Sequence, residues 1–261
     1  MILISKFEKF LKKFQLLHSL LIKIYYIYRE SEIDFSIAKK LKLNTAIDVG
    51  ANVGFYTNVF SKISSKVIAF EPIDSLAELL KKNFKKKNHI NIFSFALGEF
   101  DEEKLFFVPE GNEGEASFIN HTANSKQLRT KVKRGDDVLE GIEDIDLIKI
   151  DVEGYELNVL KGLKNSIMIN YPIFLIEIEK RHNKYFNDVF LFLQEYGYEV
   201  YYMPARLKLK KIQQSNYSNF VDNYQAIGNL NKEKKIFNYK NFYANKHYIN
   251  NFWFLNRKLY G

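Results

Sequence analysis

The chain has 261 residues, of which 46% are hydrophobic and 27% are charged, with 39 Lys and Arg against 31 Asp and Glu. This length and hydrophobic content suffice for one domain with a large buried core and argue against wholesale disorder. The absence of cysteine excludes disulfides, thiolate zinc sites, iron–sulfur clusters and cysteine nucleophiles. The net charge of +8 is only a weak indication of acidic partners, because Lys, Asn, Ile, Phe and Tyr are abundant throughout.

Residues 1–40 predict an N-terminal amphipathic helical arm ahead of a domain at 41–261. Apolar side chains such as Phe7 and Leu11 recur at helical spacing, and lysines interrupt the run before it is long enough to span a membrane. No cleavage site of a signal peptide follows it. Such a helix packs on its own domain or on a second copy in a homodimer, or it lies on an anionic membrane through residues 1–30. We expect a cytoplasmic protein, with peripheral contact to the inner membrane as the alternative.

From residue 45 onward, short buried strands alternate with helices, which predicts a parallel sheet with helices on both faces. The strands are expected at 45–49, 67–70, 90–97, 146–150, 173–178, 199–203 and 251–255. The helices are expected at 55–61, 74–87, 157–165 and 188–196. The segment 98–141 predicts an extension with a short hairpin. A basic insert at about 204–249 shows no periodicity, and neither a repeat nor a linker divides the domain.

The strongest motif is AIDVGANVGFYT at residues 46–57, where a strand runs through a glycine-rich turn into a helix. Glycine lets the chain turn tightly and lets a ligand approach the backbone. Glu71 ends the next strand, 21 residues after Gly50, and an acid there suits two hydrogen bonds to ribose hydroxyls. Together the turn and Glu71 predict a nucleoside cofactor.

The spacing of the turn distinguishes between nucleoside cofactors. A nicotinamide-dinucleotide site has Gly-x-Gly-x-x-Gly, whereas this turn has Gly50, Asn52 and Gly54 at alternate positions. Asp48 lies two residues before Gly50, where it would repel a pyrophosphate but suits a positively charged ligand such as the amino group of S-adenosylmethionine. The alternative is a glycine-rich turn that binds no ligand.

Five motifs together resemble the FkbM family of S-adenosylmethionine-dependent methyltransferases, over residues 46–179. They are IDVGANVGFYT, VIAFEP, FALGE, LIKIDVEGYELNVLKG and FLIEI, in this order. The resemblance implies an α/β, Rossmann-like class I methyltransferase sheet that is mostly parallel, with seven strands and helices on both faces. It implies that the last two strands, 199–203 and 251–255, form an antiparallel pair. It also implies O-methylation, commonly of a sugar hydroxyl in polysaccharides, glycolipids or other glycoconjugates.

The resemblance assigns the cofactor site residue by residue. The methionine and ribose end of S-adenosylmethionine would be lined by Asp48, Gly50, Asn52 and Gly54. Glu71 would hold the ribose hydroxyls, and Ala96 and Leu97 would flank the adenine. Ser117 falls where the family carries a Gly/Ser-rich loop, so we expect it to contact the substrate.

Activation of the acceptor hydroxyl requires a base or a divalent metal, because a protonated hydroxyl is a poor nucleophile. The catalytic candidates are Asp151, Glu153 and His182, and a possible Mg²⁺ set is Asp151, Glu153 and Glu177. Glu177, at the end of the fifth strand, is also a candidate substrate contact. The alternatives are that the acids at 153–156 only begin a helix and that His182 lies in a plain surface loop.

Two other functions remain as alternatives. The lysines of the 81–87 segment and the Lys- and Tyr-rich insert suit a nucleic acid, which would make the chain an RNA or DNA methyltransferase. A solvated helix end and the overall composition explain the same residues, so we do not expect nucleic acid as the acceptor. A non-catalytic module that binds S-adenosylmethionine is the other alternative, against which Asp48, Glu71 and Asp151 argue.

Overall fold

The computed structural model describes residues 42–110, 115–120, 124–182, 185–202, 209–213, 217–223, 225 and 251–260. The predicted arm at 1–40 and most of the predicted insert at 204–249 lie outside these residues. Within the described ranges, no helix has the length and apolar character needed to cross a membrane.

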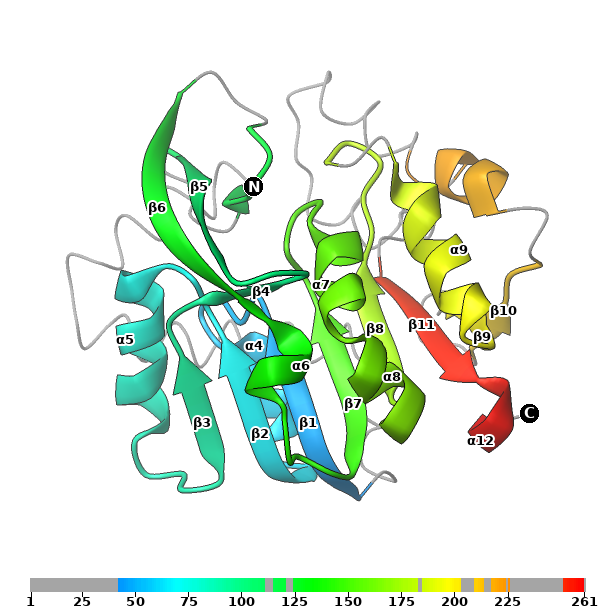
Figure 1. Cartoon of the computed structure of the whole chain (residues 1–261), viewed down its shortest axis with the longest axis horizontal. Helices are drawn as coiled ribbons and strands as arrows, with labels where there is room; N and C mark the ends of the chain where they lie inside the picture. The colour runs from blue at the N-terminus through cyan, green and yellow to red at the C-terminus, as the bar shows by residue number, and fades with distance from the viewer. Residues whose placement is uncertain are drawn as a thin grey trace, which may run out of the picture.

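The centre of the fold is a sheet of eight strands in the order β10-β9-β11-β8-β7-β1-β2-β3 (Figure 1). They are β1 (Leu43–Val49), β2 (Ser64–Phe70), β3 (Ile90–Phe93), β7 (Ile145–Ile150), β8 (Ile173–Glu177), β9 (Tyr198–Tyr202), β10 (Lys210–Lys211) and β11 (Asn251–Asn256). The five strands from β8 to β3 are parallel, whereas β11 runs antiparallel to both β8 and β9. This confirms the predicted fold class and the antiparallel last pair, with the short edge strand β10 in addition.

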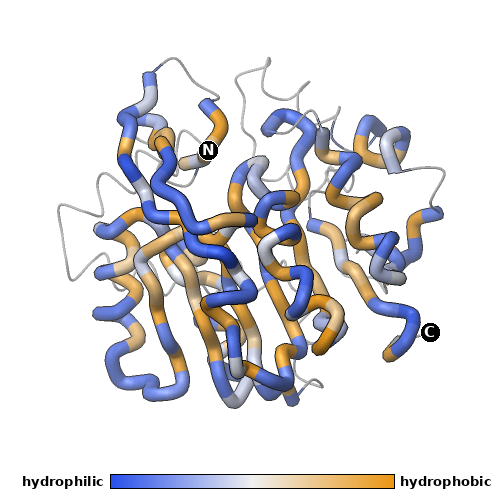
Figure 2. Tube along the Cα trace, viewed as in Figure 1, coloured by the Kyte–Doolittle hydropathy of each residue, from blue (hydrophilic) through white to orange (hydrophobic). Residues whose placement is uncertain are grey.

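Helices cover both faces of the sheet. They are α4 (Phe55–Phe60), α5 (Asp74–Phe84), α6 (Gly135–Val138), α7 (Glu156–Gly162), α8 (Lys164–Asn170), α9 (Phe186–Glu195) and α12 (Arg257–Tyr260). One face packs against α7, α8 and α9, for example through Val159 and Phe190. The other face packs against α4 through Val59 and against α5 through Leu80. Figure 2 shows the resulting concentration of hydrophobic residues along the central strands, which are buried on both sides.

A second sheet of three strands stands beside the first, in the order β4-β6-β5. Its strands are β4 (Ala96–Gly98), β5 (Glu102–Pro109) and β6 (Ser125–Arg134). β5 and β6 form an antiparallel hairpin that Figure 1 shows above the central sheet, next to α5. The hairpin predicted within 98–141 is therefore present, but its strands have 8 and 10 residues and are not short.

Two predicted elements are each two elements in the structure. The strand predicted at 90–97 divides into β3, in the central sheet, and β4, which pairs with β6 instead because the chain leaves the sheet edge after Phe93. The helix predicted at 157–165 divides into α7 and α8 at Leu163, whose backbone is not helical. The Asp136 carboxylate accepts the backbone N–H groups of Asn165 and Ser166 at 2.9 Å and so begins the new helix.

Candidate active site

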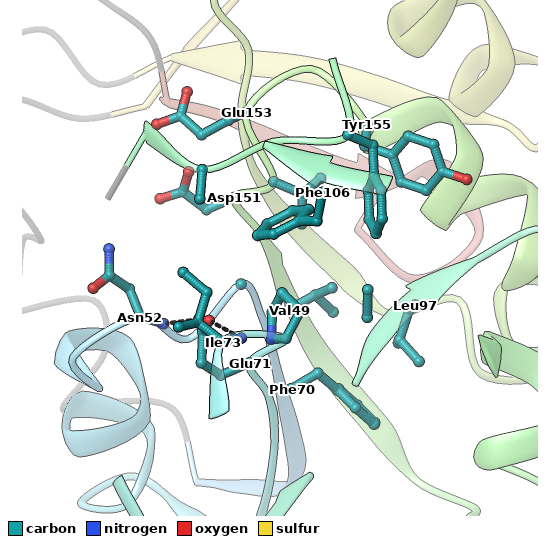
Figure 3. Close-up of a pocket in the computed structure, with 16 residues that line it drawn as sticks. Val49, Asn52, Phe70, Glu71, Ile73, Leu97, Phe106, Asp151, Glu153 and Tyr155 are labelled. Atoms are coloured by element: carbon teal, nitrogen blue, oxygen red, sulfur yellow. Dashed lines mark hydrogen bonds between the residues drawn. The ribbon is translucent and has the colours of Figure 1, made fainter. Parts of the chain in front are cut away.

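A pocket lies at the carboxyl ends of β1, β2 and β7 (Figure 3). Open α/β sheets bind their ligands at this edge. The glycine turn, the end of β2, the second sheet and the loop after β7 all contribute to its lining. The predicted site residues that line it are Gly50, Asn52, Glu71, Ala96, Leu97, Asp151 and Glu153.

The glycine turn is shaped by contact with the end of β7 as well as by its own bend. Gly50 has φ +82°, and a Cβ atom at this position would lie 1.9 Å from the carbonyl oxygen of Asp151. Only glycine lets the turn and β7 come this close. Asn52 also has a positive φ, of 50°, and such backbone strain is a frequent feature of ligand sites.

Glu71 is a buried carboxylate that backbone amides hold at the pocket wall. Its Oε2 accepts the N–H of Asn52 at 2.7 Å and its Oε1 accepts the N–H of Ile73 at 2.9 Å (Figure 3). Carboxylate oxygens accept hydrogen bonds and have more than one lone pair each, so a carboxylate held by amides is suited to hydroxyl donors of a ligand. Two adjacent hydroxyls, such as those of a ribose, match this arrangement.

Asp48 and Gly54, which were predicted to bind the cofactor, are not among the residues that line this pocket. Asp48 is 1% exposed, and the hydroxyl of Thr57 in α4 donates to its Oδ2 at 2.5 Å. Burial raises the pKa of Asp48 to about 6, against the lowering effects of the Thr57 hydrogen bond and the Lys149 charge. Asp48 therefore joins β1 to α4 below the turn, and Gly54, with φ 86°, begins α4.

Apolar side chains form the part of the pocket between Glu71 and the second sheet. Ala96 and Leu97 lie there as predicted. Several apolar lining residues were not predicted, among them Ile73, Phe106, Phe118 and Tyr155. In β5, the apolar residues Phe106 and Val108 are two positions apart and both are buried. This spacing was a sequence signal that one face of a strand packs against apolar neighbours.

The loop after β7 places two carboxylates at the pocket, Asp151 and Glu153 (Figure 3). Behind them lies Lys149, a completely buried lysine whose Nζ is 3.5 Å from Oδ2 of Asp151. The same ammonium group donates to the carbonyl oxygen of Ile150 and lies 5.0 Å from the centre of the Tyr56 ring. Lys149 was missed as a site residue, although a lysine in the otherwise apolar strand LIKI was a visible signal.

His182 contacts this loop without itself lining the pocket. Its Nδ1 makes a short contact with Oε2 of Glu153 and lies 3.9 Å from Oε2 of Glu179. Burial, with the nearby Arg181 charge, lowers the pKa of His182 and so favours the neutral ring. The structure therefore brings the three predicted catalytic residues together, with Asp151 and Glu153 at the pocket and His182 behind Glu153.

The carboxylates around this loop have strongly altered proton affinities. Burial raises the pKa of Glu153 well above its usual range, and the neighbouring Asp151 charge raises it further. The same two causes raise the pKa of Glu177, which ends β8 and does not line the pocket. Burial also raises the pKa of Glu156 to about 7, although its Oε1 accepts the N–H of Gly154 at 2.7 Å. Displaced proton affinities in a cleft are typical of functional sites.

The predicted Mg²⁺ set is not borne out by this geometry. Among the residues that the structure describes, no group of three or more His, Asp or Glu side chains is arranged to hold a metal ion. Asp151 and Glu153 face the pocket, whereas Glu177 lies outside its lining. The three carboxylates therefore do not form one ligand set.

Ser117, predicted to contact the substrate, is held by hydrogen bonds within the protein. The residue is 1% exposed, and its hydroxyl donates to the carbonyl oxygen of Glu153 at 2.6 Å and accepts the N–H of Ile119 at 3.1 Å. Its neighbours Ala116 and Phe118 line the pocket. The hydroxyl thus ties the 115–120 segment to the acidic loop.

The lysine-rich segment at 81–87 lies far from the pocket. It ends α5, which begins at the pocket edge of the sheet and runs to the opposite edge, where β3 begins (Figure 1). The placement gives no support to a nucleic acid as the acceptor.

Comparison with known proteins identifies one family. The family model described as the methyltransferase FkbM domain matches residues 48–200. A methyltransferase of Sordaria araneosa, sdnD, is 25% identical over 180 residues, which cover 54% of this chain and 70% of that protein. The hexuronic acid methyltransferase AglP of Haloferax volcanii is 27% identical over 130 residues, covering 48% of this chain and 53% of that protein.

Other matches are more distant or cover less of the other protein. The AMB antimetabolite synthetase AmbE of Pseudomonas aeruginosa is 23% identical, over 52% of this chain but 8% of that protein. A crystal structure of methyltransferase FkbM from Methylobacillus flagellatus has a TM-score of 0.44 and 19% identity. That match covers 64% of this chain and 42% of the other.

Proposed function

The chain belongs to the FkbM methyltransferase family, and from this premise we propose that it transfers a methyl group from S-adenosylmethionine to a sugar hydroxyl. The sugar would be part of a polysaccharide, a glycolipid or another glycoconjugate. The observation that carries the proposal is one pocket with two ends of different chemistry. Glu71, fixed by two backbone amides, and an apolar slot form one end, and Asp151 and Glu153 form the other.

The first end suits the nucleoside part of S-adenosylmethionine. Glu71 would accept hydrogen bonds from the ribose hydroxyls, and the adenine would lie against Leu97 and its apolar neighbours. The carboxylates of Asp151 and Glu153 suit the other part of the cofactor, whose sulfonium group is positively charged. Bound there, S-adenosylmethionine supplies the methyl group for an in-line displacement.

The second end suits activation of an acceptor hydroxyl. In an in-line displacement the protein mainly aligns the oxygen nucleophile with the methyl carbon and the sulfur. One of the two carboxylates, Asp151 or Glu153, would accept the hydroxyl proton as the oxygen attacks and S-adenosylhomocysteine leaves. Because burial raises the pKa of Glu153, its carboxylate binds a proton more readily than an exposed glutamate. His182, in contact with Glu153, would orient that carboxylate.

A sugar is the proposed acceptor because a hydroxyl matches this acidic base set and because one relative is described as a hexuronic acid methyltransferase. The described part of the chain offers no second observation that favours a nucleic acid. The proposed site of action is cytoplasmic, with contact to a membrane or to a second copy through the predicted arm.

Two measurements test the proposal. Calorimetric titration with S-adenosylhomocysteine should give micromolar binding, and titration with NAD should give none. Transfer of a radiolabelled methyl group from S-adenosylmethionine is then measured on a panel of neutral and uronic-acid oligosaccharides, with transfer RNA as the comparison. Binding of NAD alone would overturn the cofactor, and labelling of the RNA alone would overturn the acceptor. Tight binding without transfer to any member of the panel would favour a non-catalytic module.

A further inference from the structure

The β5–β6 hairpin is not part of the central sheet, yet it contributes a wall of the pocket. Side chains of β5 alternate, so Leu105 faces outward with 46% exposure while Phe106 is 5% exposed. Phe106 packs in one apolar cluster with Ile73 and Leu76, from the chain that follows Glu71. The hairpin thus meets the central fold beside the residue expected to hold a ribose.

The ring of Phe106 is held in place from behind. Its centre lies 4.8 Å from that of Phe118, with an angle of 63° between the rings, and Phe118 lies 4.6 Å from Tyr155. The backbones of Phe107 and Ser117 exchange two hydrogen bonds, of 2.8 and 3.0 Å. Since Ser117 is also bonded to Glu153, the aromatic wall is connected to the acidic loop.

The position of this wall relative to Glu71 indicates which part of a ligand it meets. Figure 3 shows the Phe106 ring above Glu71, Ile73 and Val49, which line the same pocket. The carboxylates of Asp151 and Glu153 occupy another part of the pocket (Figure 3). Ile73, Leu97 and Phe106 therefore offer an apolar environment to a base joined to a ribose at Glu71.

We propose that Phe106 is the aromatic wall of a purine subsite, so that the hairpin, and not the central sheet alone, determines cofactor affinity. This inference rests on the proposed function, because it assumes a nucleoside whose ribose binds Glu71. Purine rings have flat π faces, and stacking a base on an aromatic side chain changes affinity by about tenfold or more. The contact is with the face of the base, so it does not depend on the hydrogen-bonding groups at the base edge.

The test is calorimetric titration of variants with S-adenosylhomocysteine and with 5′-methylthioadenosine, which lacks the amino-acid end. Phe106→Ala should lower the affinity for both ligands by a similar factor of about ten or more, because the ring contacts only the nucleoside that the two ligands share. Phe106→Leu keeps an apolar side chain but removes the flat ring, and it should also lower the affinity for both ligands. Leu105→Ala, one residue away on the outer face, is the matched control and should bind as the wild type does.

The outcomes separate this inference from the proposed function. Unchanged affinity in folded Phe106→Ala, or wild-type affinity in Phe106→Leu, would show that the ring only fills space, and would overturn the inference while leaving the cofactor assignment intact. Loss of S-adenosylhomocysteine affinity without loss of 5′-methylthioadenosine affinity would overturn it as well. If the wild type binds neither ligand, both proposals fall. Circular dichroism of each variant reports its folding, and Phe106→Leu remains decisive if Phe106→Ala does not fold.

Discussion

The Nζ atom of Lys149 lies 3.5 Å from Oδ2 of Asp151, and the lysine is completely buried whereas the Asp151 side chain is 27% exposed at the pocket. One partner of this ion pair therefore faces the ligand site and the other supports it from the core. In the pairing of β1 with β7, Lys149 is also the register partner of Asp48. A single buried cation thus lies between a buried carboxylate, Asp48, and one that lines the pocket, Asp151.

Replacing Lys149 with Met should strongly destabilise the protein. The change leaves Asp48 and Asp151 without their cation, and removal of one partner of a buried ion pair costs about 3–5 kcal/mol. Urea denaturation would measure the loss. Lys161→Met is the control, because Lys161 is 38% exposed and 3.9 Å from Glu99, and its free energy of unfolding should change by less than about 1 kcal/mol. Equal effects of the two changes would contradict the assigned role of Lys149.

Asp151→Asn should abolish turnover with little change in fold or in cofactor affinity. The amide keeps the size of the side chain but cannot accept a proton, and loss of a general base lowers turnover by about 10²- to 10⁴-fold. Methyl transfer to the acceptor found in the oligosaccharide screen, together with titration of S-adenosylhomocysteine, would measure both quantities. Asp137→Asn, with a side chain 62% exposed, is the control. Full activity of Asp151→Asn would remove its catalytic role.

Glu71→Ala should weaken the binding of S-adenosylhomocysteine by about tenfold to a hundredfold, because each hydrogen bond to a charged group contributes about 1.5–3 kcal/mol. It also frees the N–H groups of Asn52 and Ile73 that now orient the carboxylate. Calorimetry gives the dissociation constants. Glu78→Ala, on the exposed side of α5, should leave the affinity unchanged. If Glu71→Ala binds as tightly as the wild type, the ribose assignment is wrong.

Gly50→Ala should be far more damaging than Gly141→Ala. Both glycines have positive φ, of 82° and 73°, so both changes carry a backbone strain of about 1 kcal/mol or more. At Gly50 the added Cβ would also lie 1.9 Å from the Asp151 carbonyl oxygen, whereas at Gly141 it meets no atom within 4 Å. Chemical denaturation of both variants measures the difference. Similar losses of unfolding free energy in the two variants would mean that the close approach of the turn to β7 does not make Gly50 necessary.

Stability should fall as the pH rises from about 4.5 to about 7, in part because of Glu156. Its pKa is raised by burial from 4.5 to about 7, so between these values the folded chain binds a proton that the unfolded chain has lost. This stabilisation is complete below pH 4.5, is lost as the pH rises through 7, and is on the order of 3 kcal/mol. Asp48, whose pKa is raised to about 6, acts in the same direction.

Glu156→Gln isolates this contribution, because Gln can still accept the Gly154 N–H but does not titrate. The variant should be more stable than the wild type at pH 8, and its stability should vary less between pH 5 and 8. Glu103→Gln, on the exposed side of β5, is the control. A pH dependence identical to that of the wild type would exclude Glu156 as a source.

The sequence by itself determined the alternation of strands and helices and the meeting of the glycine turn with Glu71. Both depend on local chemistry: apolar runs are buried strands, and parallel strands bring their carboxyl ends, and the residues after them, to one edge. The antiparallel last pair and the family were predicted on other grounds, from the five motifs that resemble the FkbM methyltransferases. The placement of Gly50, Glu71 and Asp151 at one pocket followed from the same rule.

Only the tertiary structure decided which of these side chains face the pocket. Asp48 and Asp151 both lie at strand ends, but α4 covers Asp48 through Thr57 while Asp151 remains partly exposed. Whether a carboxylate is buried depends on the element packed over it, which local sequence does not specify. The contact of His182 with Glu153 and the aromatic wall from Phe106 likewise depend on segments that are far apart in the sequence and meet in space.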